Sequence, residues 1–96
     1  MKKMYVYIIT NKVNSTFYIG VTSNLVRRIW EHKNGIYEGF TKRYNLHKLV
    51  YYEIYADELT AIEREKKLKL WRRCKKIDLV CRSNPNFVDL YDDIVK

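Results

Sequence analysis

Two short segments near the start of the chain have the composition and alternation typical of β-strands. Residues Met4–Thr10 read MYVYIIT and residues Thr16–Val21 read TFYIGV, so both are rich in β-branched and aromatic side chains. The polar stretch Asn11–Ser15 between them is short and suits a tight connection. We therefore predict that these residues form a β-hairpin.

Side chains of a strand alternate between its two faces. This alternation places Tyr5 and Tyr7 on one face of the first strand, and Tyr18 and Gly20 on one face of the second. A third segment, Leu49–Tyr55, is again rich in Val, Ile and Tyr, and we predict that it adds a third strand.

An amphipathic helix is predicted after the hairpin. Thr22, Ser23 and Asn24 all offer side-chain oxygens that can cap its N-terminus, and Gly35 suits its end. Its apolar side is formed by Leu25, Val26, Ile29 and Trp30.

Polar residues border that apolar side. Arg28 and His32 are one helical turn apart along its edge, whereas Arg27 and Glu31 point further toward solvent. We therefore expect Arg28 and His32 to lie beside the core.

A basic, aromatic loop and a second long helix are predicted next. Residues Ile36–Asn45 have no clear period, which indicates a loop. Asp57 or Thr60 can cap a helix over Glu58–Arg73. In that helix a carboxylate interrupts the apolar face, which consists of Ala61, Glu65 and Leu68, flanked by Ile62. The pair Asn84-Pro85 predicts the start of a last short helix that continues through Ile94.

Length and composition are those of one globular domain. The 96 residues include 47% hydrophobic and 31% charged side chains, with three Gly and one Pro, so we expect residues 1–96 to form a single domain. Lys and Arg outnumber Asp and Glu by 19 to 11, which gives a net charge of +8. A polyanion is therefore an expected partner, and a basic surface that serves solubility alone is an equal alternative on charge. The nine Tyr, three Phe and two Trp favour nucleic acid over a membrane surface.

The chain carries no segment typical of export or membrane insertion, because no apolar stretch is long enough for a signal peptide or a membrane span. We expect a cytoplasmic protein without a membrane partner. Cys74 and Cys81 have no CxxC spacing, and we interpret both as small core residues rather than a disulfide or a metal site.

Several motifs, taken in order, resemble those of the GIY-YIG nucleases, and in particular a group of small stand-alone bacterial domains. Tyr5-Val6-Tyr7 occupies the place of the first motif, with Tyr where the family has Gly, and Tyr18-Ile19-Gly20 matches the second. Arg28 and His32 follow at the family's spacing. Glu65 lies at the position of the family's metal-binding carboxylate. The resemblance covers nearly the whole chain, and the order and spacing of the motifs are more specific than any one of them.

The resemblance implies a candidate catalytic set. Glu65 would hold one Mg²⁺ or Mn²⁺, with Glu63 as the alternative ligand if the helix register differs. Arg28 would bind a phosphate oxygen through its planar guanidinium. Tyr7 and Tyr18 would orient the attacking water, one of them as general base, and His32 would assist proton transfer or hold a tyrosine or phosphate in place. The pattern does not choose between these alternatives.

Further basic residues are candidates for contacts with the DNA backbone. They lie in the predicted loop, as Lys42, Arg43 and Tyr44, and along the second helix, as Lys66, Lys69 and Arg72, with Lys67, Arg73, Lys75 and Lys76 beside them. For the helix cluster, a solvated basic surface is an equal alternative. Val21 follows the second motif where the repair nucleases of the family have a Lys, so no lysine role transfers to that position.

The sequence thus predicts an α/β (α+β) fold: a three-stranded antiparallel sheet flanked by helices, with the site on the sheet surface bordered by the first two long helices. We expect a divalent-metal-dependent DNA endonuclease, suited to DNA repair or to processing branched or damaged DNA. A catalytically weak or inactive module that binds DNA or RNA is the alternative. We expect a monomer with structure-selective or weakly selective action, because a chain of 96 residues has no room for a targeting module. A partner protein that supplies target choice is left open by the sequence.

Overall fold

The computed structural model describes residues 3–36 and 39–96, and within them it contains three strands and five helices. In chain order these elements are β1 (Met4–Thr10), β2 (Phe17–Thr22), α1 (Leu25–Lys33), α2 (Phe40–Arg43), β3 (Lys48–Tyr55), α3 (Glu58–Leu70), α4 (Arg73–Ser83) and α5 (Tyr91–Ile94). The hairpin and the third strand form as predicted, each within one residue of the expected bounds.

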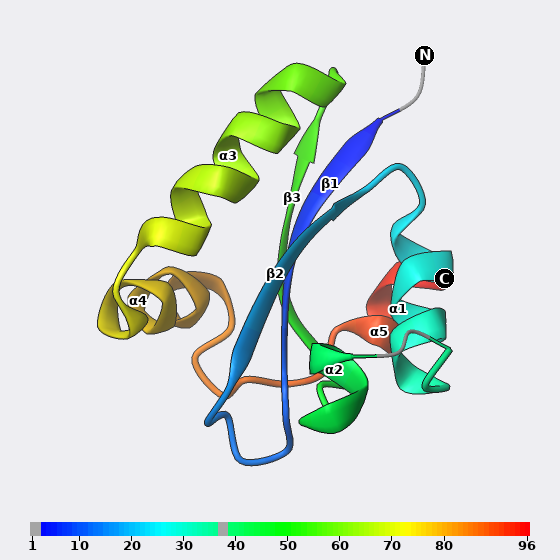
Figure 1. Ribbon diagram of the computed structural model, residues 1–96, viewed down its shortest axis with the longest axis vertical. Coiled ribbons are helices and arrows are strands. Elements are labelled where there is room, and N and C mark those ends of the chain that lie inside the picture. Colours follow the sequence, from blue (N-terminus) through cyan, green and yellow to red (C-terminus); the bar gives the residue numbers. More distant parts are fainter. Residues whose placement is uncertain (1–2, 37–38) are drawn as a thin grey trace.

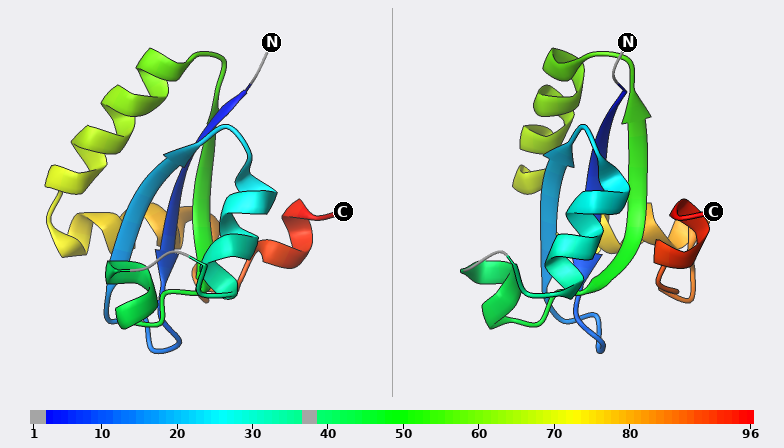
Figure 2. Two further views of the ribbon diagram at one scale, coloured as in Figure 1. Left: turned by 45° about the vertical axis from the view of Figure 1, so that its right-hand side comes forward. Right: turned by 90° about the vertical axis from the view of Figure 1, so that its right-hand side faces the viewer.

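The three strands form one antiparallel sheet in the order β2-β1-β3, so β1 is central and β2 and β3 are its edges. In the hairpin register Tyr7 lies opposite Gly20, and Ile9 lies opposite Tyr18. This arrangement confirms the predicted three-stranded sheet flanked by helices. Figures 1 and 2 show α3 and α4 on one face of the sheet and α1, α2 and α5 on the other.

Two separate cores result, because β1 is apolar on both faces. Val6 and Ile8 pack beneath α3 and α4, whereas Tyr7 and Ile9 pack beneath α1, and all four side chains are fully buried. Each buried aliphatic side chain of this size stabilises the fold by roughly 1.5–3 kcal/mol. A strand with two apolar faces requires helices on both sides, and this requirement sets the layering of the molecule.

The caps of the two long helices match the sequence. Oδ1 of Asn24 accepts a hydrogen bond from N of Arg27 at 3.1 Å, and Oδ2 of Asp57 accepts one from N of Thr60 at 2.9 Å. Gly35 follows the end of α1 with a φ of 64°, a conformation that glycine adopts without strain. The prediction that Asn24 and Asp57 can cap these helices is therefore confirmed.

A carboxylate on β3 anchors α3 to the sheet. Glu53 accepts two hydrogen bonds from Arg64, each at 3.0 Å, and further bonds from the hydroxyls of Tyr51 and Tyr55. Although burial raises the pKa of Glu53, these hydrogen bonds outweigh it and hold that pKa below its usual range. This bidentate contact fixes the rotation of α3 about its axis. It therefore also fixes the direction in which Glu65, the residue after Arg64, projects from the helix.

The second long helix forms as predicted but ends earlier than expected, and the helix that follows it was not predicted. The helix predicted over Glu58–Arg73 ends at Leu70, because Trp71 and Arg72 have extended backbone conformations. A separate helix, α4, then begins at Arg73 and had not been predicted. Trp71 packs against the core beneath α3, which favours a break there over a continuous helix.

The last helix is also shorter than predicted. Asn84 does not start it but ends α4, and its buried side chain donates hydrogen bonds to the carbonyls of Val50 and Val88 at 3.0 and 2.8 Å. These bonds attach the segment after α4 to β3, and only Tyr91–Ile94 is helical. The predicted loop Ile36–Asn45 likewise contains one helical turn, α2, and its residues 37 and 38 lie outside the described residues.

Candidate active site

A buried hydrogen-bonded chain lies where the first strand meets α1. The hydroxyl of Tyr7 is 3.0 Å from Nε2 of His32, and Nδ1 of the same ring is 3.2 Å from Oγ1 of Thr41 on α2. A neutral imidazole donates through one nitrogen and accepts through the other, so His32 links its two neighbours in either tautomer. All three side chains are buried.

His32 is uncharged at neutral pH. Burial and the positive charge of Arg28 lower the pKa of His32 from 6.5 to about 4, although the carboxylate of Glu31 raises it in part. The ring is therefore a hydrogen-bond partner of Tyr7 rather than a second cation beside Arg28.

The second-motif tyrosine completes an aromatic cluster. Tyr18 is half-buried, and its ring centre lies 6.4 Å from that of Tyr7 and 5.8 Å from that of His32. Gly20, on the same face of β2, leaves the space that the Tyr7 ring occupies. The predicted alternation therefore brings the two motif tyrosines to the same face as His32.

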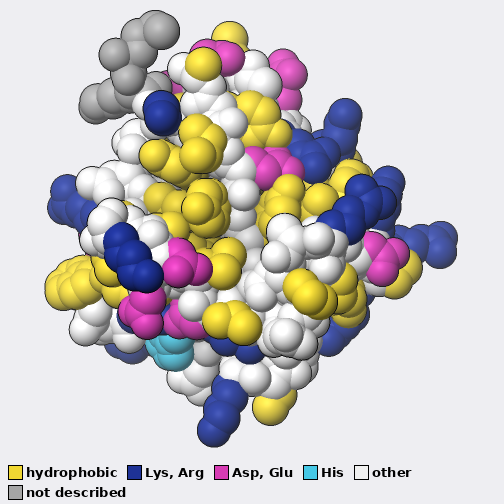
Figure 3. Space-filling model, turned by 180° about the vertical axis from the view of Figure 1, so that it is seen from behind, with side chains coloured by type: hydrophobic (Ala, Val, Ile, Leu, Met, Phe, Trp, Pro, Cys, Tyr) yellow, Lys and Arg dark blue, Asp and Glu magenta, His cyan; other side chains and the backbone are white. Residues whose placement is uncertain are grey.

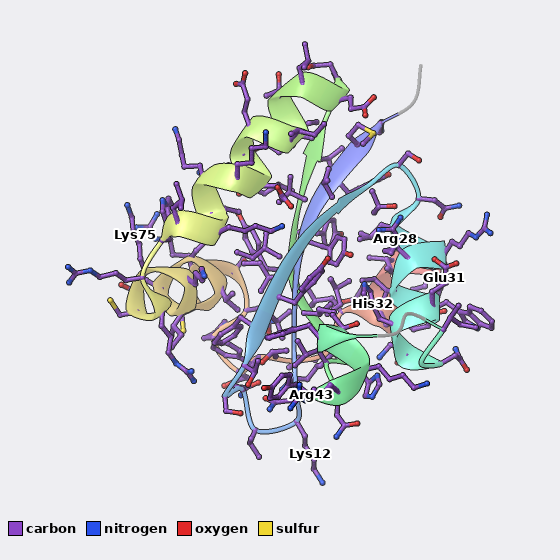
Figure 4. The ribbon with its side chains drawn as sticks, viewed as in Figure 1. Lys12, Arg28, Glu31, His32, Arg43 and Lys75 are labelled. Atoms are coloured by element: carbon purple, nitrogen blue, oxygen red, sulfur yellow. The ribbon has the colours of Figure 1, made fainter. Side chains whose placement is uncertain are left out.

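Arg28 lies one turn before His32 on α1, and Figure 4 shows both residues on the side of α1 that faces the sheet. The side chain of Arg28 is one-third exposed, and its Nε lies 3.7 Å from a carboxylate oxygen of Glu31. A polar hollow of about 230 Å³ opens beside it, lined by Thr22, Asn24, Arg27, Arg28 and Glu31. Arg28 is thus both held in place and reachable from solvent.

Glu65 lies on another helix than Arg28 and His32. It lies in the buried stripe of α3 with Ala61 and Leu68, and its side chain is only 12% exposed. Its Oε2 forms an ion pair of 2.6 Å with Nζ of Lys69, and that ammonium lies 6.0 Å from the centre of the Tyr18 ring. Lys69 therefore connects the carboxylate to the aromatic cluster.

The structure brings four of the five predicted catalytic residues together on one face of the sheet: Tyr7, Tyr18, Arg28 and His32. Glu65 belongs to α3, which covers the other face, so the expectation that both long helices border one sheet surface is wrong. The reason is the apolar stripe of α3, which packs on the Val6 and Ile8 side of β1. α3 also packs against the edge strand β2, which carries Tyr18.

The donors around Glu65 suit one kind of metal ion. Within residues 3–36 and 39–96, no three His, Cys, Asp or Glu side chains cluster as a metal site would require. A tetrahedral zinc site is therefore a poor fit here. A single half-buried carboxylate suits Mg²⁺ or Mn²⁺, because such ions keep several waters and share the rest of their shell with a phosphate.

The basic residues singled out in the sequence fall into two groups, one on α2 and one on α3 and the turn after it. Lys42, Arg43 and Tyr44 are exposed on or next to α2, and Lys66, Lys69 and Arg72 are exposed on α3 and just beyond it. The views in Figures 1 and 2 place α2 and α3 on opposite sides of the edge strand β2. Positive charge therefore flanks the strand that carries Tyr18.

The face of the molecule opposite to the one seen in Figure 1 differs in its side-chain composition. Hydrophobic and acidic side chains occupy its centre, and Lys and Arg lie mainly toward its rim (Figure 3). A hollow of about 340 Å³ is lined by Tyr5, Leu25, Tyr52 and Ile54, with Ile94 of α5. None of the predicted catalytic residues lines it, so we do not assign the chemistry to this side.

Two residues near the site had no role in the sequence prediction. Thr41 holds His32, and the ring centre of Phe40 lies 6.4 Å from that of Tyr18. Both belong to α2, which had been interpreted as loop. The spacing of Phe40 and Tyr44, four residues apart, was the available signal for a helical turn at this position.

Comparison with known proteins identifies the family. The GIY-YIG catalytic domain matches residues 3–78 of this chain. Among curated relatives, the UPF0213 protein of Staphylococcus haemolyticus is 36% identical over 80 residues, which cover 83% of this chain and 96% of the relative. The UPF0213 protein of Clostridium perfringens is 37% identical over 76 residues, 79% of this chain and 81% of the relative.

A solved structure has the same fold. The solution NMR structure of the UPF0213 protein BH0048 from Bacillus halodurans superposes with a TM-score of 0.57 at 28% sequence identity. The match covers 91% of this chain and 92% of the other. In the part of the chain that the structure describes, no helix has the length and apolar character needed to cross a lipid bilayer.

Proposed function

Because this chain belongs to the GIY-YIG family, we propose that it is a divalent-metal-dependent endonuclease that hydrolyses phosphodiester bonds in DNA. The observation that carries the proposal is the cluster of Tyr7, Tyr18 and His32 beside Arg28. This cluster lies next to the edge strand β2, and Glu65 lies on α3, which packs against the same strand. Processing of damaged or branched DNA, as in repair, is the role that such an activity suits best.

Glu65 is the residue proposed to hold Mg²⁺ or Mn²⁺. When bound, such an ion supplies positive charge to the phosphate and to the departing oxygen. Glu65 suits this role because its carboxylate is largely shielded from solvent yet already has a cation, Lys69, at 2.6 Å. Glu63, the alternative ligand, is exposed on the same helix and therefore suits the role less well.

Arg28 is the proposed phosphate clamp. Its guanidinium is permanently charged and can form two parallel hydrogen bonds to phosphate oxygens. The contact with Glu31 limits the positions that the side chain can adopt, and the adjoining polar hollow leaves room for an anionic oxygen. We infer that Arg28 neutralises charge that gathers on the phosphate during attack.

Tyr18 is the proposed partner of the attacking water. Tyr7 is fully buried and its hydroxyl is bonded to His32, whereas Tyr18 is half-buried and lies nearer the strand edge. Neutral His32 would then fix the Tyr7 hydroxyl, and with it the packing of Tyr18, rather than supply charge. This assignment makes Tyr7 and His32 positioning residues in the free protein.

A weakly active or inactive nucleic-acid-binding module is the second candidate. The ion pair between Glu65 and Lys69 favours it, because the pair neutralises a carboxylate that would otherwise repel a phosphate chain. In the endonuclease, by contrast, Glu65 would hold the metal ion instead of the Lys69 ammonium.

The experiment that separates the two candidates is a cleavage assay with the purified protein. Labelled duplex, nicked, branched and single-stranded DNA would be incubated with Mg²⁺, Mn²⁺ or EDTA. Cleavage that requires metal would support the endonuclease. Salt-sensitive binding to DNA or RNA without cleavage under every condition would support the binding module instead.

A further inference from the structure

Two large aromatic side chains are exposed at the two ends of α2, one on its first residue and one just after its last. Phe40 and Tyr44 are 49% and 43% exposed, and their ring centres lie 4.8 Å apart at an interplanar angle of 44°. Residues four apart in a helical turn project from the same side, which explains why the rings adjoin. Together, Phe40 and Tyr44 form what we call the aromatic platform.

The platform is held firmly against the candidate site. Thr41, between the two aromatic residues in sequence, is buried and bonded to Nδ1 of His32. Its carbonyl accepts a hydrogen bond of 2.9 Å from N of Leu46, whose side chain is fully buried. The short helix is therefore anchored at its centre while its two rings face solvent.

Aromatic rings continue without a break from the platform to the buried chain. Phe40 lies 6.4 Å from Tyr18, and Tyr18 lies 5.8 Å from His32, both measured between ring centres. The Phe40 and Tyr18 planes are inclined by only 33°. A molecule that reaches Tyr18 from the solvent side would thus meet Phe40 and Tyr44 beside it.

The charges around the platform are those that a nucleic-acid strand needs. The guanidinium of Arg43 lies 5.7 Å from the centre of the Tyr44 ring, and Lys42 is exposed on the same turn. On the other side of Tyr18, the ammonium of Lys69 lies 6.0 Å from that ring. α2 itself reads FTKR and contains no acidic residue. Exposed rings bordered by cations complement bases joined by phosphates.

We propose that Phe40 and Tyr44 stack against an unpaired DNA base beside the scissile phosphate, so that the preferred substrate carries single-stranded nucleotides next to the cleaved bond. The inference rests on the proposed endonuclease function and deepens it. Inside a duplex the faces of a base are covered by its neighbours, and only an unpaired or terminal base offers a face to a protein ring. Sequence preference would then be weak, because every base has such a face.

Binding without cleavage tests the platform directly. The affinities of the full chain for a single-stranded oligonucleotide and for the matching duplex would be compared in EDTA by fluorescence anisotropy. A variant with Phe40→Leu and Tyr44→Leu should bind the single strand about tenfold or more weakly, the size expected for one lost stacked base. Its affinity for the duplex should change by less than about threefold, because no stacked base is lost there.

Trp30→Leu is the matched control, because Trp30 is an exposed aromatic on α1, 47% exposed, outside the platform. It should leave single-strand affinity unchanged. Tyr44→Phe keeps the ring and should also bind as the wild type does. If the double Leu variant fails to fold, Tyr44→Leu alone should still weaken single-strand binding, since Tyr44 is largely at the surface.

A fluorescent base analogue, 2-aminopurine, reports stacking at one position of the strand. When 2-aminopurine occupies the position that stacks on the platform, its emission should be quenched on binding to the wild type. This quenching should be lost in the variant with Phe40→Leu and Tyr44→Leu. Equal losses for duplex and single strand, unchanged single-strand affinity, or absence of any DNA binding would overturn the platform. If the double variant binds DNA normally and still cleaves it in the presence of metal, the platform is overturned and the endonuclease stands. If binding depends on the platform but no cleavage occurs, only the endonuclease is overturned.

Discussion

Gly20 lies directly against the ring of Tyr7: a Cβ atom added to Gly20 would come within 2.4 Å of Cζ and Oη of that tyrosine. The two residues face each other in the register between β1 and β2. One motif thus supplies a ring and the other supplies the space for it. The two motifs therefore work as one structural unit that holds the Tyr7 hydroxyl at His32.

Replacing Gly20 with Ala should destabilise the fold. The new methyl group would overlap a fully buried ring between two paired strands, so neither side can move freely. We expect a loss of about 1–3 kcal/mol in the free energy of unfolding, typical of an overpacked core. Thermal denaturation followed by circular dichroism would measure it.

The Tyr7→Leu background provides the control for Gly20→Ala. With the ring absent, the added methyl group should cost much less than it does in the wild type, because the two changes are coupled through one contact. An equal cost in both backgrounds, or an unchanged melting temperature for Gly20→Ala alone, would contradict the proposed fit between the motifs.

The pH dependence of stability should carry the signature of His32. Its folded-state pKa of about 4 lies below the usual 6.5, so only the unfolded chain binds this proton between those values. Stability from this residue is therefore complete above pH 6.5 and is lost as the pH falls toward 4, by an amount on the order of 3 kcal/mol.

His32→Gln is the variant that isolates this contribution, because it can still bond to Tyr7 and Thr41 but does not titrate. Urea unfolding at several pH values would measure the difference in stability between the wild type and His32→Gln. The contributions of the other titrating groups are common to both proteins and cancel in this difference. The wild type should lose more stability than His32→Gln on acidification from pH 6.5 to 4. Parallel pH profiles would show that His32 is not buried in the neutral form.

Much of the local structure around Tyr7 could be predicted from sequence. Strand alternation placed Tyr7 and Tyr18 on defined faces, and helical spacing placed Arg28 one turn from His32. These relations depend on neighbours within a few residues, which is why the pattern alone was sufficient.

The relation of Glu65 to that cluster could not be predicted in the same way. Both faces of β1 are apolar, so its pattern does not tell which face a given helix covers. α3 covers the face opposite to α1, a choice made by tertiary packing. The helix α4 was missed because its spacing of Ile77, Val80 and Cys81 is weak between many charged residues.

Lys69 should compete with a metal ion for Glu65. Because its ammonium lies 2.6 Å from the carboxylate, Lys69→Met should strengthen Mn²⁺ binding by roughly three- to tenfold, as expected when one nearby like charge is removed. Lys66→Met, an exposed lysine of the same helix, is the matched control. Electron paramagnetic resonance of free Mn²⁺ would measure both affinities, and equal effects of the two substitutions would argue against competition at Glu65.

Arg28 should matter far more than its neighbour Arg27. Each arginine has its Nε 3.7 Å from a carboxylate oxygen of Glu31, but the side chain of Arg28 is 33% exposed and that of Arg27 is 75% exposed. Arg28→Ala should lower the cleavage rate by about 100-fold, as expected for a lost transition-state contact, and should weaken DNA binding. Arg27→Ala should lower the rate only slightly.

Removing Arg28 should also raise the pKa of His32, because its positive charge contributes to lowering that pKa. A ¹H–¹⁵N NMR titration of the imidazole in Arg28→Ala and in the wild type would measure this shift. A clamp role for Arg28 would be contradicted by similar cleavage rates of Arg28→Ala and Arg27→Ala.

The most direct test of the proposed endonuclease is metal-dependent cleavage by Glu65→Gln beside Glu63→Gln. The two substitutions each remove one charge from α3 without changing its shape, but Glu65 is half-buried beside Lys69 and Glu63 is exposed. Glu65→Gln should abolish cleavage and bind DNA at least as tightly as the wild type, whereas Glu63→Gln should cleave normally. Equal cleavage by both variants and the wild type would contradict it.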